Sequence, residues 1–348
     1  MKAHVFGKMA GIIAFDGIVR RALARERVFR DRENPMEMLN DEEIYERYRF
    51  DRGGIIFITN LIEDDIESPT ERNHAIPPIL QVFVALRFYA CGSFQQVIAD
   101  TIRIHQSTAC RIIHRVTNAL IRRINQFVRF PTGNEVNAVK AGFYDVAHFP
   151  NVLGLVDGSH VRIMAPHRNE PDYVNRKKYH SINAQIICND ENMITNVVAN
   201  WPGSTHDSRI LRESEIGRQF ARQEHRGVLI GDSGYSSKNW LMIPYLNPAN
   251  DPQRRYNRAL KRTRCIVECT IGIWKRRFHC LHDELRLHPI KCCRIIAATA
   301  ILHNIAKQRN LPDFEDEIDN EDQPDPVQPE DDHDDNLTRD RLVQQYFQ

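Results

Sequence analysis

Residues 152–158 read Val-Leu-Gly-Leu-Val-Asp-Gly, an apolar run that ends in an acidic residue and a glycine. A short, continuous apolar run bounded by turn residues is typical of a buried β-strand. The stretch therefore predicts a strand that ends at Asp157 and presents its carboxylate at the edge of a sheet.

Two further apolar runs also lead to an aspartate. Residues 194–201 pass through a Pro-Gly turn to Asp207, at the predicted start of a helix, and residues 227–231 lead directly to Asp232. The separations along the chain leave room for strands and crossover connections between these acids. Because adjacent strands bring their ends together, we expect the three carboxylates to converge.

A fourth acid, Glu268, lies in a basic segment that is predicted to be helical from 264 to 278. It is the only acidic residue between Gln253 and Phe278, where it stands among nine lysines and arginines. A carboxylate surrounded by cations stays ionised. The cations themselves would suit a polyphosphate.

Together the four acids predict a site for a divalent metal. Mg²⁺ and similar hard cations are held by a few carboxylates and by phosphate oxygens, and two such ions can clamp the oxygens of a phosphodiester displacement. Each acid alone also has a simpler interpretation. An Asp before Gly is a common turn residue, an Asp after Ser-Thr is a common helix cap, and Glu268 could form ion pairs along its own helix.

Several strings in this region resemble the PIF/Harbinger transposases of the DDE superfamily. They are GLVDGSH (154–160), YVNRKKYHSIN (173–183), NWPGSTHDSRIL (200–211), GDSGY (231–235) and the helix that carries Glu268. Three more strings are similar to the Harbinger transposase-derived nucleases of animals, namely SPTERNHAIPP (68–78), GSFQQVIAD (92–100) and ILHNIA (301–306). The likeness covers roughly residues 41–310.

The resemblance implies an RNase H-like catalytic fold with Mg²⁺ or Mn²⁺ as cofactor. Asp157, Asp207 and Glu268 match the catalytic DDE triad, and Asp232 matches a further acid that would complete the metal site. The implied reaction is hydrolysis of DNA phosphodiester bonds. Transposases of this family depend on a separate Myb-like (Myb/SANT-like) protein for DNA binding and nuclear entry, so a partner of that kind is implied as well.

We therefore predict an α/β RNase H-like DDE domain preceded by a mainly helical domain with a helix-turn-helix-like unit. The expected segments are a basic N-terminal extension (1–40), the helical domain (41–149), the nuclease domain (150–312) and an acidic disordered tail (313–348). In the N-terminal extension, a basic amphipathic helix is expected that contacts phosphate or packs on the core. The tail could also compete with nucleic acid for the basic body of the protein.

Candidate nucleic-acid contacts come from three places. Lys261, Arg264 and Lys275 on the basic helix would neutralise phosphates, and Arg176 and Lys177 lie in a loop that mixes cations with aromatic residues. In the helical domain, residues 94–102 and 107–124 predict helix, turn and helix, with Ser93 and Ser107 as caps. Arg111 would then face DNA. A plain helical hairpin packed on the nuclease domain fits the same pattern.

Charge and cysteine usage narrow the class of protein. Residues 313–335 hold 13 Asp and Glu and no Lys or Arg, so the rest of the chain carries a net charge of +14, which suits nucleic acid. No apolar run reaches the length of a membrane span, and no membrane partner is expected. The eight cysteines lack paired zinc-site spacing. Cys265 and Cys269 are expected to be buried small apolar residues.

Two other functions remain open at this point. The chain could be a DNA-binding or partner-binding module that has lost its chemistry, or an active Harbinger-type transposase that performs strand transfer. We expect an intracellular protein of the nucleus and cytoplasm, although no dense lysine cluster identifies an import signal. The sequence leaves a homo-oligomer open.

Overall fold

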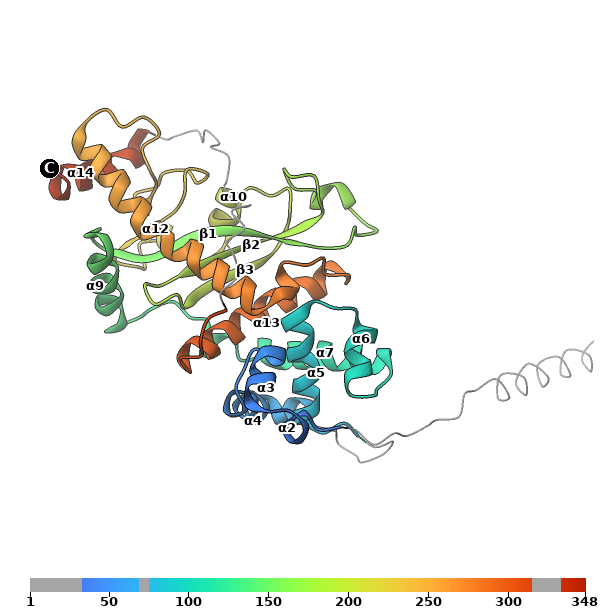
Figure 1. The fold of residues 1–348 in the computed structure, drawn as a ribbon. Helices are drawn as coiled ribbons and strands as arrows, with labels where there is room; N and C mark the ends of the chain where they lie inside the picture. Colours follow the sequence, from blue (N-terminus) through green and yellow to red (C-terminus); the bar gives the residue numbers. More distant parts are fainter. Residues whose placement is uncertain (1–32, 69–74, 315–332) are drawn as a thin grey trace, which may run out of the picture.

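The computed structural model describes residues 33–68, 75–314 and 333–348 (Figure 1). Its first half is helical. The helices are α2 (Pro35–Met38), α3 (Asp41–Tyr48), α4 (Arg52–Ile66), α5 (Pro78–Cys91), α6 (Gln95–Thr101), α7 (Gln106–Ile121), α8 (Ile124–Phe127) and α9 (Glu135–Ala147). The basic helix expected at the start of the chain lies outside the described residues.

Helix starts in this half follow local capping chemistry. Asn40 and Glu43 form a capping box at α3, and the Asp51 carboxylate accepts from the Gly54 backbone at the start of α4, which satisfies amides that have no partner within the helix. The serine caps predicted for α6 and α7 are wrong. α6 has no side-chain cap, and the N-cap of α7 is His105, whose Nδ1 accepts from the Ser107 backbone N–H.

The second half contains a mixed five-stranded sheet. The strands are β1 (Val152–Arg162), β2 (Ser181–Cys188), β3 (Ile194–Pro202), β4 (Val228–Ile230) and β5 (Leu241–Met242), in the order β3-β2-β1-β4-β5. β2 is antiparallel to both neighbours, whereas β1, β4 and β5 are parallel. The mixed α/β prediction is therefore confirmed. A short 3₁₀ helix, η1 (Glu170–Tyr173), lies between β1 and β2.

The prediction that the first strand ends at Asp157 is wrong. β1 continues to Arg162, and Asp157 lies within it, opposite Ile186 of β2. The residues from Gly158 to Arg162 look like a turn in sequence because of their glycine and polar side chains. They form a strand because β2 supplies partners for their backbone groups along the whole stretch, which the local pattern does not reveal.

Helices cover both faces of the sheet. α10 (Asp207–Glu213) and α11 (Glu215–Ala221) pack on one apolar cluster that includes Leu153 and Leu229, whereas α12 (Asp251–Arg277) and α13 (Pro289–Gln308) belong to a larger cluster that includes Leu155 and Ile186. Successive residues of a strand face opposite sides, so a continuous apolar run in β1 fits a strand that is covered on both faces. The 3₁₀ helix η2 (His279–Leu281) joins α12 to α13.

α13 lies between the sheet and the helical half in Figure 1, and it contacts both β3 and α7. The Asn304 amide donates to the backbone carbonyls of Phe127 and Ile194, and so it joins the two halves. His303 on α13 is fully buried. It bonds the Asn192 carbonyl at 2.8 Å, and burial lowers its pKa to about 4.

The last described helix, α14 (His333–Tyr346), corrects the prediction of a disordered tail for residues 333–348. It packs on α12, with Val343 and Phe347 buried. Phe347 contacts the rings of Phe149 and Tyr256, and its carbonyl accepts from Arg255 Nε at 2.9 Å. The sequence did not indicate α14 because the acidic residues that precede it suggested disorder, whereas the aromatic contacts that order the helix come from distant parts of the chain. Residues 315–332, where most of that acidic charge lies, are outside the described part of the chain.

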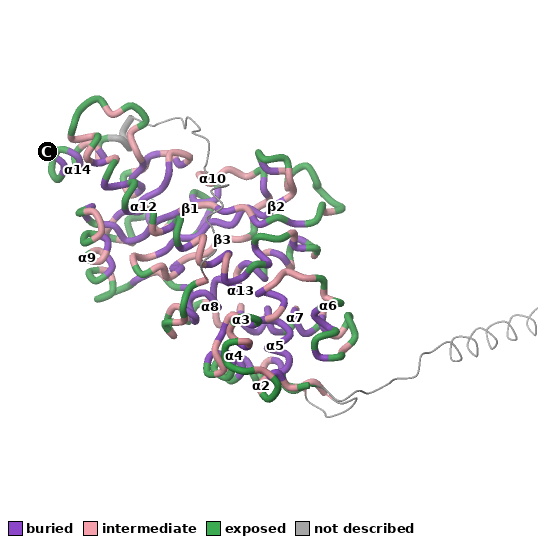
Figure 2. The backbone as a smooth tube through the Cα atoms, in the orientation of Figure 1, coloured by how far each residue is buried: buried purple, intermediate pink, exposed green. Residues whose placement is uncertain are grey.

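Among the described helices, none combines the length and the apolar character that crossing a membrane requires. α9 packs on β1 and α12, although the sequence groups it with the helical half. In Figure 2 the buried positions run through β1 and β2 at the centre of the sheet, while exposed positions recur along α12.

Candidate active site

Asp157 is held in the centre of the sheet on the side that faces α12. Its side chain is only 15% exposed, and its Oδ1 accepts from the Gly158 backbone at 2.9 Å. Burial, together with the nearby carboxylates of Asp232 and Asp207, raises its pKa to about 7 against the opposing charge of Arg264. Asp207 and Asp232 are therefore close enough to Asp157 to disfavour its ionisation.

Asp207 is the first residue of α10, and Asn183 of β2 positions its carboxylate. The Asn183 amide donates to Asp207 Oδ1 at 2.6 Å and to the Thr205 carbonyl at 2.9 Å. Burial raises the pKa of Asp207, an effect that the Asn183 hydrogen bond opposes and Asp232 reinforces. The carboxylate also lies against Gly158, where a Cβ atom would be 2.5 Å from Asp207 Oδ1. Glycine at 158 thus allows α10 to approach β1.

Asp232 follows β4 and is almost fully buried, with its Oδ1 accepting from the Gly234 backbone at 2.9 Å. Ser208, next to Asp207, fixes the loop that carries it. The Ser208 hydroxyl donates to the Gly234 carbonyl at 2.8 Å and accepts from the Ser236 backbone at 3.2 Å. One serine therefore joins the start of α10 to the loop after β4, which brings two of the acids together.

Arg264 and Glu268 approach the aspartates from α12. Arg264 Nη2 lies 3.5 Å from Asp157 Oδ2 and 3.4 Å from Glu268 Oε1, and the arginine side chain is 15% exposed. Glu268 is 55% exposed and lies one turn beyond Arg264. The structure thus brings all four predicted acids to one region, with a guanidinium between the first and the last of them.

The residues present fit a hard divalent cation. They offer carboxylate oxygens, and burial, reinforced by the neighbouring Asp232 and Asp207, raises the pKa of Asp157 in spite of the positive charge of Arg264. No set of three or more His, Cys, Asp and Glu side chains in the described ranges is arranged to hold a metal as it stands. A cation shared by Asp157 and Glu268 would have to take the place of the Arg264 guanidinium between their oxygens.

The predicted phosphate contacts differ in their surroundings. Lys261, Arg176 and Lys177 are exposed, and Arg176 lies near enough to Asp207 to lower its pKa. The prediction that Lys275 contacts phosphate is wrong. Only 6% of this residue is exposed, and its ammonium donates to the His160 carbonyl at 3.1 Å. The cations beside it in the sequence suggested an exposed side chain, but Lys275 faces the sheet.

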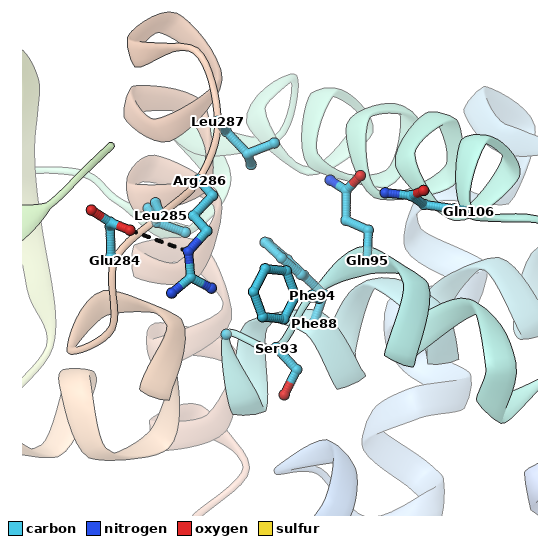
Figure 3. A pocket seen from close by; sticks show the side chains of 10 residues that line it. Phe88, Ser93, Phe94, Gln95, Gln106, Glu284, Leu285, Arg286 and Leu287 are labelled. Atoms are coloured by element: carbon cyan, nitrogen blue, oxygen red, sulfur yellow. Dashed lines mark hydrogen bonds and ion pairs between the residues drawn. The ribbon is translucent and has the colours of Figure 1, made fainter. Parts of the chain in front are cut away.

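The helix-turn-helix-like unit, α6 and α7, leaves Arg111 exposed with its Nε bonded to the Ser107 carbonyl. A pocket lies where this unit meets the segment before α13 (Figure 3). Arg286 stacks over the Phe94 ring at 4.4 Å and pairs with Glu284, while Gln106 lies beside Gln95. The start of α7 therefore adjoins the catalytic half.

Sequence reasoning gave no role to the polar residues that arrange the acids, which are Asn183, Gln185, Ser208 and Tyr235. Gln185 donates to the Asp207 carbonyl at 3.1 Å and to the Tyr235 hydroxyl at 2.9 Å. All but Gln185 lie within the quoted family strings. Ser181, Asn183 and Gln185 are polar residues at alternate positions of an otherwise apolar strand, and that alternation was the available signal.

Comparison with known proteins agrees with this geometry. The family described as DDE superfamily endonuclease matches residues 156–304, a range that contains all four acids. HARBI1 of Homo sapiens is 37% identical over 281 residues, which cover 79% of this chain and 80% of HARBI1. The chain belongs to the Harbinger transposase-derived nuclease family.

Other members of this family group extend the range of similarity. HARBI1 of Xenopus laevis is 35% identical over 281 residues, covering 79% of this chain and 81% of that protein. The ALP1-like protein of Arabidopsis thaliana is 27% identical over 244 residues, covering 65% of this chain and 59% of that protein. No solved structure matches the chain significantly. The chain shares this family with the HARBI1 proteins, which are named as candidate nucleases.

Proposed function

We propose that this protein hydrolyses DNA phosphodiester bonds with a divalent metal, Mg²⁺ or Mn²⁺. The observation that carries the proposal is the convergence of Asp157, Asp207 and Asp232 in one cluster, where burial and then the neighbouring carboxylates raise the pKa of Asp157. Glu268 joins them through Arg264. The sheet order and the DDE family match support an RNase H-like catalytic domain.

In this proposal Asp157, Asp207 and Glu268 would hold the metal, and Asp232 would complete or orient the ligand set. Bound metal would supply an activated water and would stabilise the leaving oxygen. The chain's own contribution is positional. Asn183 fixes the Asp207 carboxylate, Ser208 ties its helix to the Asp232 loop, and the buried setting excludes competing water from the aspartates.

The test combines metal binding with nicking of a supercoiled plasmid. We expect the wild-type protein to bind Mn²⁺ in calorimetry and to nick the plasmid, and we expect EDTA to abolish nicking. Asp157→Asn and Glu268→Gln should each lose nicking by at least about a hundredfold, because removal of a residue that merely supports a metal ligand already costs about 10–100-fold. Glu215→Gln, an exposed acid on α11, is the matched control and should nick like the wild type.

A second candidate function is a catalytically silent module that binds DNA or a protein partner. The observation that favours it is the pairing of Arg264 with both Asp157 and Glu268, because a permanent guanidinium would exclude metal. Wild-type protein that binds DNA but takes up no Mn²⁺ would establish this alternative. Strand transfer between DNA ends in the same assay would instead identify an active transposase.

Partners and location follow from the proposed family function. We propose DNA as substrate, a Myb/SANT-like protein as the partner for DNA targeting and nuclear entry, and a distribution between nucleus and cytoplasm. A homo-oligomer is a further proposal, and light scattering would measure the molar mass of the protein in solution. Imaging of the tagged protein with and without the Myb-like partner tests the localisation: unchanged distribution would contradict partner-dependent import.

A further inference from the structure

The exposed face of α12 carries cations that form no ion pair with any carboxylate in the described part of the chain. Arg258, Lys261 and Arg262 are all exposed, and none of them forms an ion pair or a side-chain hydrogen bond with another residue in the described part of the chain. Spacings of three and four residues place side chains on the same side of a helix. These three cations therefore form one group, called here the α12 basic face.

Three arginines on α10, on α11 and just after α11 differ from these cations because each forms an ion pair with a carboxylate. Arg212 pairs with Glu213 at 3.3 Å, Arg218 with Glu215 at 3.8 Å, and Arg222 with Glu224 at 2.9 Å. These are ordinary surface ion pairs that contribute little to stability. The contrast matters because like charges three or four residues apart on a helix repel one another, so the α12 basic face has a cost in the isolated protein that no described carboxylate offsets.

The position of this face links it to the acids. Arg258 and Glu268 are ten residues apart on one helix, which corresponds to about 15 Å along the helix axis. Phosphates follow one another about every 3.4 Å along the axis of one DNA strand, so about four of them would lie along the stretch of α12 from Arg258 to Glu268. The helix then delivers Arg264 and Glu268 to Asp157.

We propose that the α12 basic face, Arg258, Lys261 and Arg262, is the docking surface for the DNA backbone that leads to the acidic cluster. The inference rests on the proposed function for its substrate, but it assigns a binding surface rather than a catalytic group. Arg176 lies beside Asp207, so the strand that follows α12 would meet a further cation after it passes the acids.

The first experiment measures the salt dependence of DNA binding with EDTA present, so that no cleavage occurs. A labelled duplex is titrated by fluorescence anisotropy against wild type and against a variant with Arg258→Gln, Lys261→Gln and Arg262→Gln. Each lost phosphate contact lowers the slope of log affinity against log salt by about 0.9. We expect the slope to fall by about 2 to 3 and the affinity at low salt to fall at least about tenfold.

Two variants separate this surface from simple loss of charge. A variant with Arg212→Gln, Arg218→Gln and Arg222→Gln removes the same three positive charges from α10 and α11 and should change the slope by less than about one. A variant with Arg258→Lys, Lys261→Arg and Arg262→Lys keeps the charge and should bind like wild type. Equal losses in the two glutamine variants would overturn the proposal, because only net charge would then matter.

The native cysteines provide a test without substitution. Of the eight cysteines, only Cys265 and Cys269 are exposed, which corrects the expectation that they are buried. Both lie on α12, and Cys265 is one turn from Lys261. Duplex DNA should slow the alkylation of Cys265 severalfold, and high salt should restore the rate. An unchanged rate under conditions where DNA is bound would contradict docking on this face.

Failure of this inference and failure of the proposed function give different results. If the protein cuts DNA but the α12 glutamine variant binds like wild type, the nuclease stands and the docking surface is wrong. If the α12 basic face governs binding but no Mn²⁺-dependent cutting occurs, the docking surface stands and the nuclease proposal is wrong. Circular dichroism melting of each variant identifies any loss of folding.

Discussion

At the scale of single residues, Asp157 links the site to the stability of the fold. Its carboxyl has an ordinary pKa of 3.8, which burial raises to about 7. Between these values the folded chain binds more protons at Asp157 than the unfolded chain does, so stability falls as pH rises. The contribution of the protonated form is complete below about pH 4 and is lost as pH passes 7.

Replacing Asp157 by Asn should therefore stabilise the protein at pH 8 in the presence of EDTA. We expect a gain of about 2–4 kcal/mol at pH 8 and little change at pH 4, because a shift of one pKa unit corresponds to about 1.4 kcal/mol. Urea denaturation at the two pH values measures it. Asp145→Asn, at an exposed acid on α9, is the control. Equal effects of Asp157→Asn at both pH values would contradict the raised pKa.

Arg264 carries the second prediction at this scale. Its guanidinium lies against Asp157 and Glu268, so it competes with any cation for the same oxygens. Arg264→Gln should tighten Mn²⁺ binding about tenfold, since like charges a few ångströms apart repel by more than 1 kcal/mol even near a protein surface. Calorimetry measures the affinity.

The matched control for Arg264→Gln is Arg254→Gln. Arg254 is an exposed arginine near the start of the same helix, and it pairs with Asp251. It should leave Mn²⁺ affinity unchanged. Weaker Mn²⁺ binding by Arg264→Gln would mean that the arginine organises the ligands instead of competing with metal.

At the scale of elements, α14 makes a measurable contribution to the catalytic half. Phe347 is 8% exposed and packs between Phe149 and Tyr256. Phe347→Ala should lower the free energy of unfolding by about 2–3 kcal/mol, below the usual cost of a fully buried phenylalanine because the site lies near a surface. Chemical denaturation measures the loss. Gln345→Ala, exposed on the same helix, should have little effect, and equal losses would contradict specific docking.

Elements also show what local sequence could and could not predict. β3 and β4 were recognisable because short apolar runs with turns on either side have few other structures available. The lengths of β1 and α12 were underestimated from the sequence. β1 extends through glycine and polar residues because β2 pairs with it, and α12 begins at Asp251 rather than near 264 because its first turns pack on Tyr245 and α14. Long-range partners decided both lengths.

At the scale of the whole molecule, the two halves share one apolar cluster. It contains residues from α5, α7, the sheet and α13, and Asn304 bonds backbone groups from both halves. We therefore expect a single unfolding transition for residues 33–314, with coincident loss of helix and of tryptophan fluorescence. Two separated transitions would show that the halves fold independently.

The same reasoning predicts the behaviour of the catalytic half alone. Residues 150–312 expressed without the helical half should expose the side of α13 that normally contacts α7, bind hydrophobic dyes and melt without a sharp transition. Dye binding and calorimetric melting check this. The control is residues 33–348, which keep that contact, and a fragment that melts as sharply as the control would contradict a shared core.

The acids and their convergence were predictable from sequence, whereas the side chains that hold them in place were not. Asp207, Asp232 and Glu268 lie where the apolar runs and the basic helix indicated. The second set of residues, Asn183 and Ser208, became visible only in three dimensions because each acts on an acid from a different part of the chain. The Arg264 pairs and the buried Lys275 likewise depend on which side of α12 faces the sheet.

The docking of α14 has a consequence for how the protein could be divided. Residues 315–332 connect α14 to the remainder, but the contacts that hold it are side-chain and carbonyl contacts to α12 and its neighbours. A covalent link mainly raises the local concentration of a helix at its binding site. A synthetic peptide of residues 333–348 would therefore be a complementing fragment for a chain that ends at 314, so that folding of the catalytic half could be controlled by adding a second molecule.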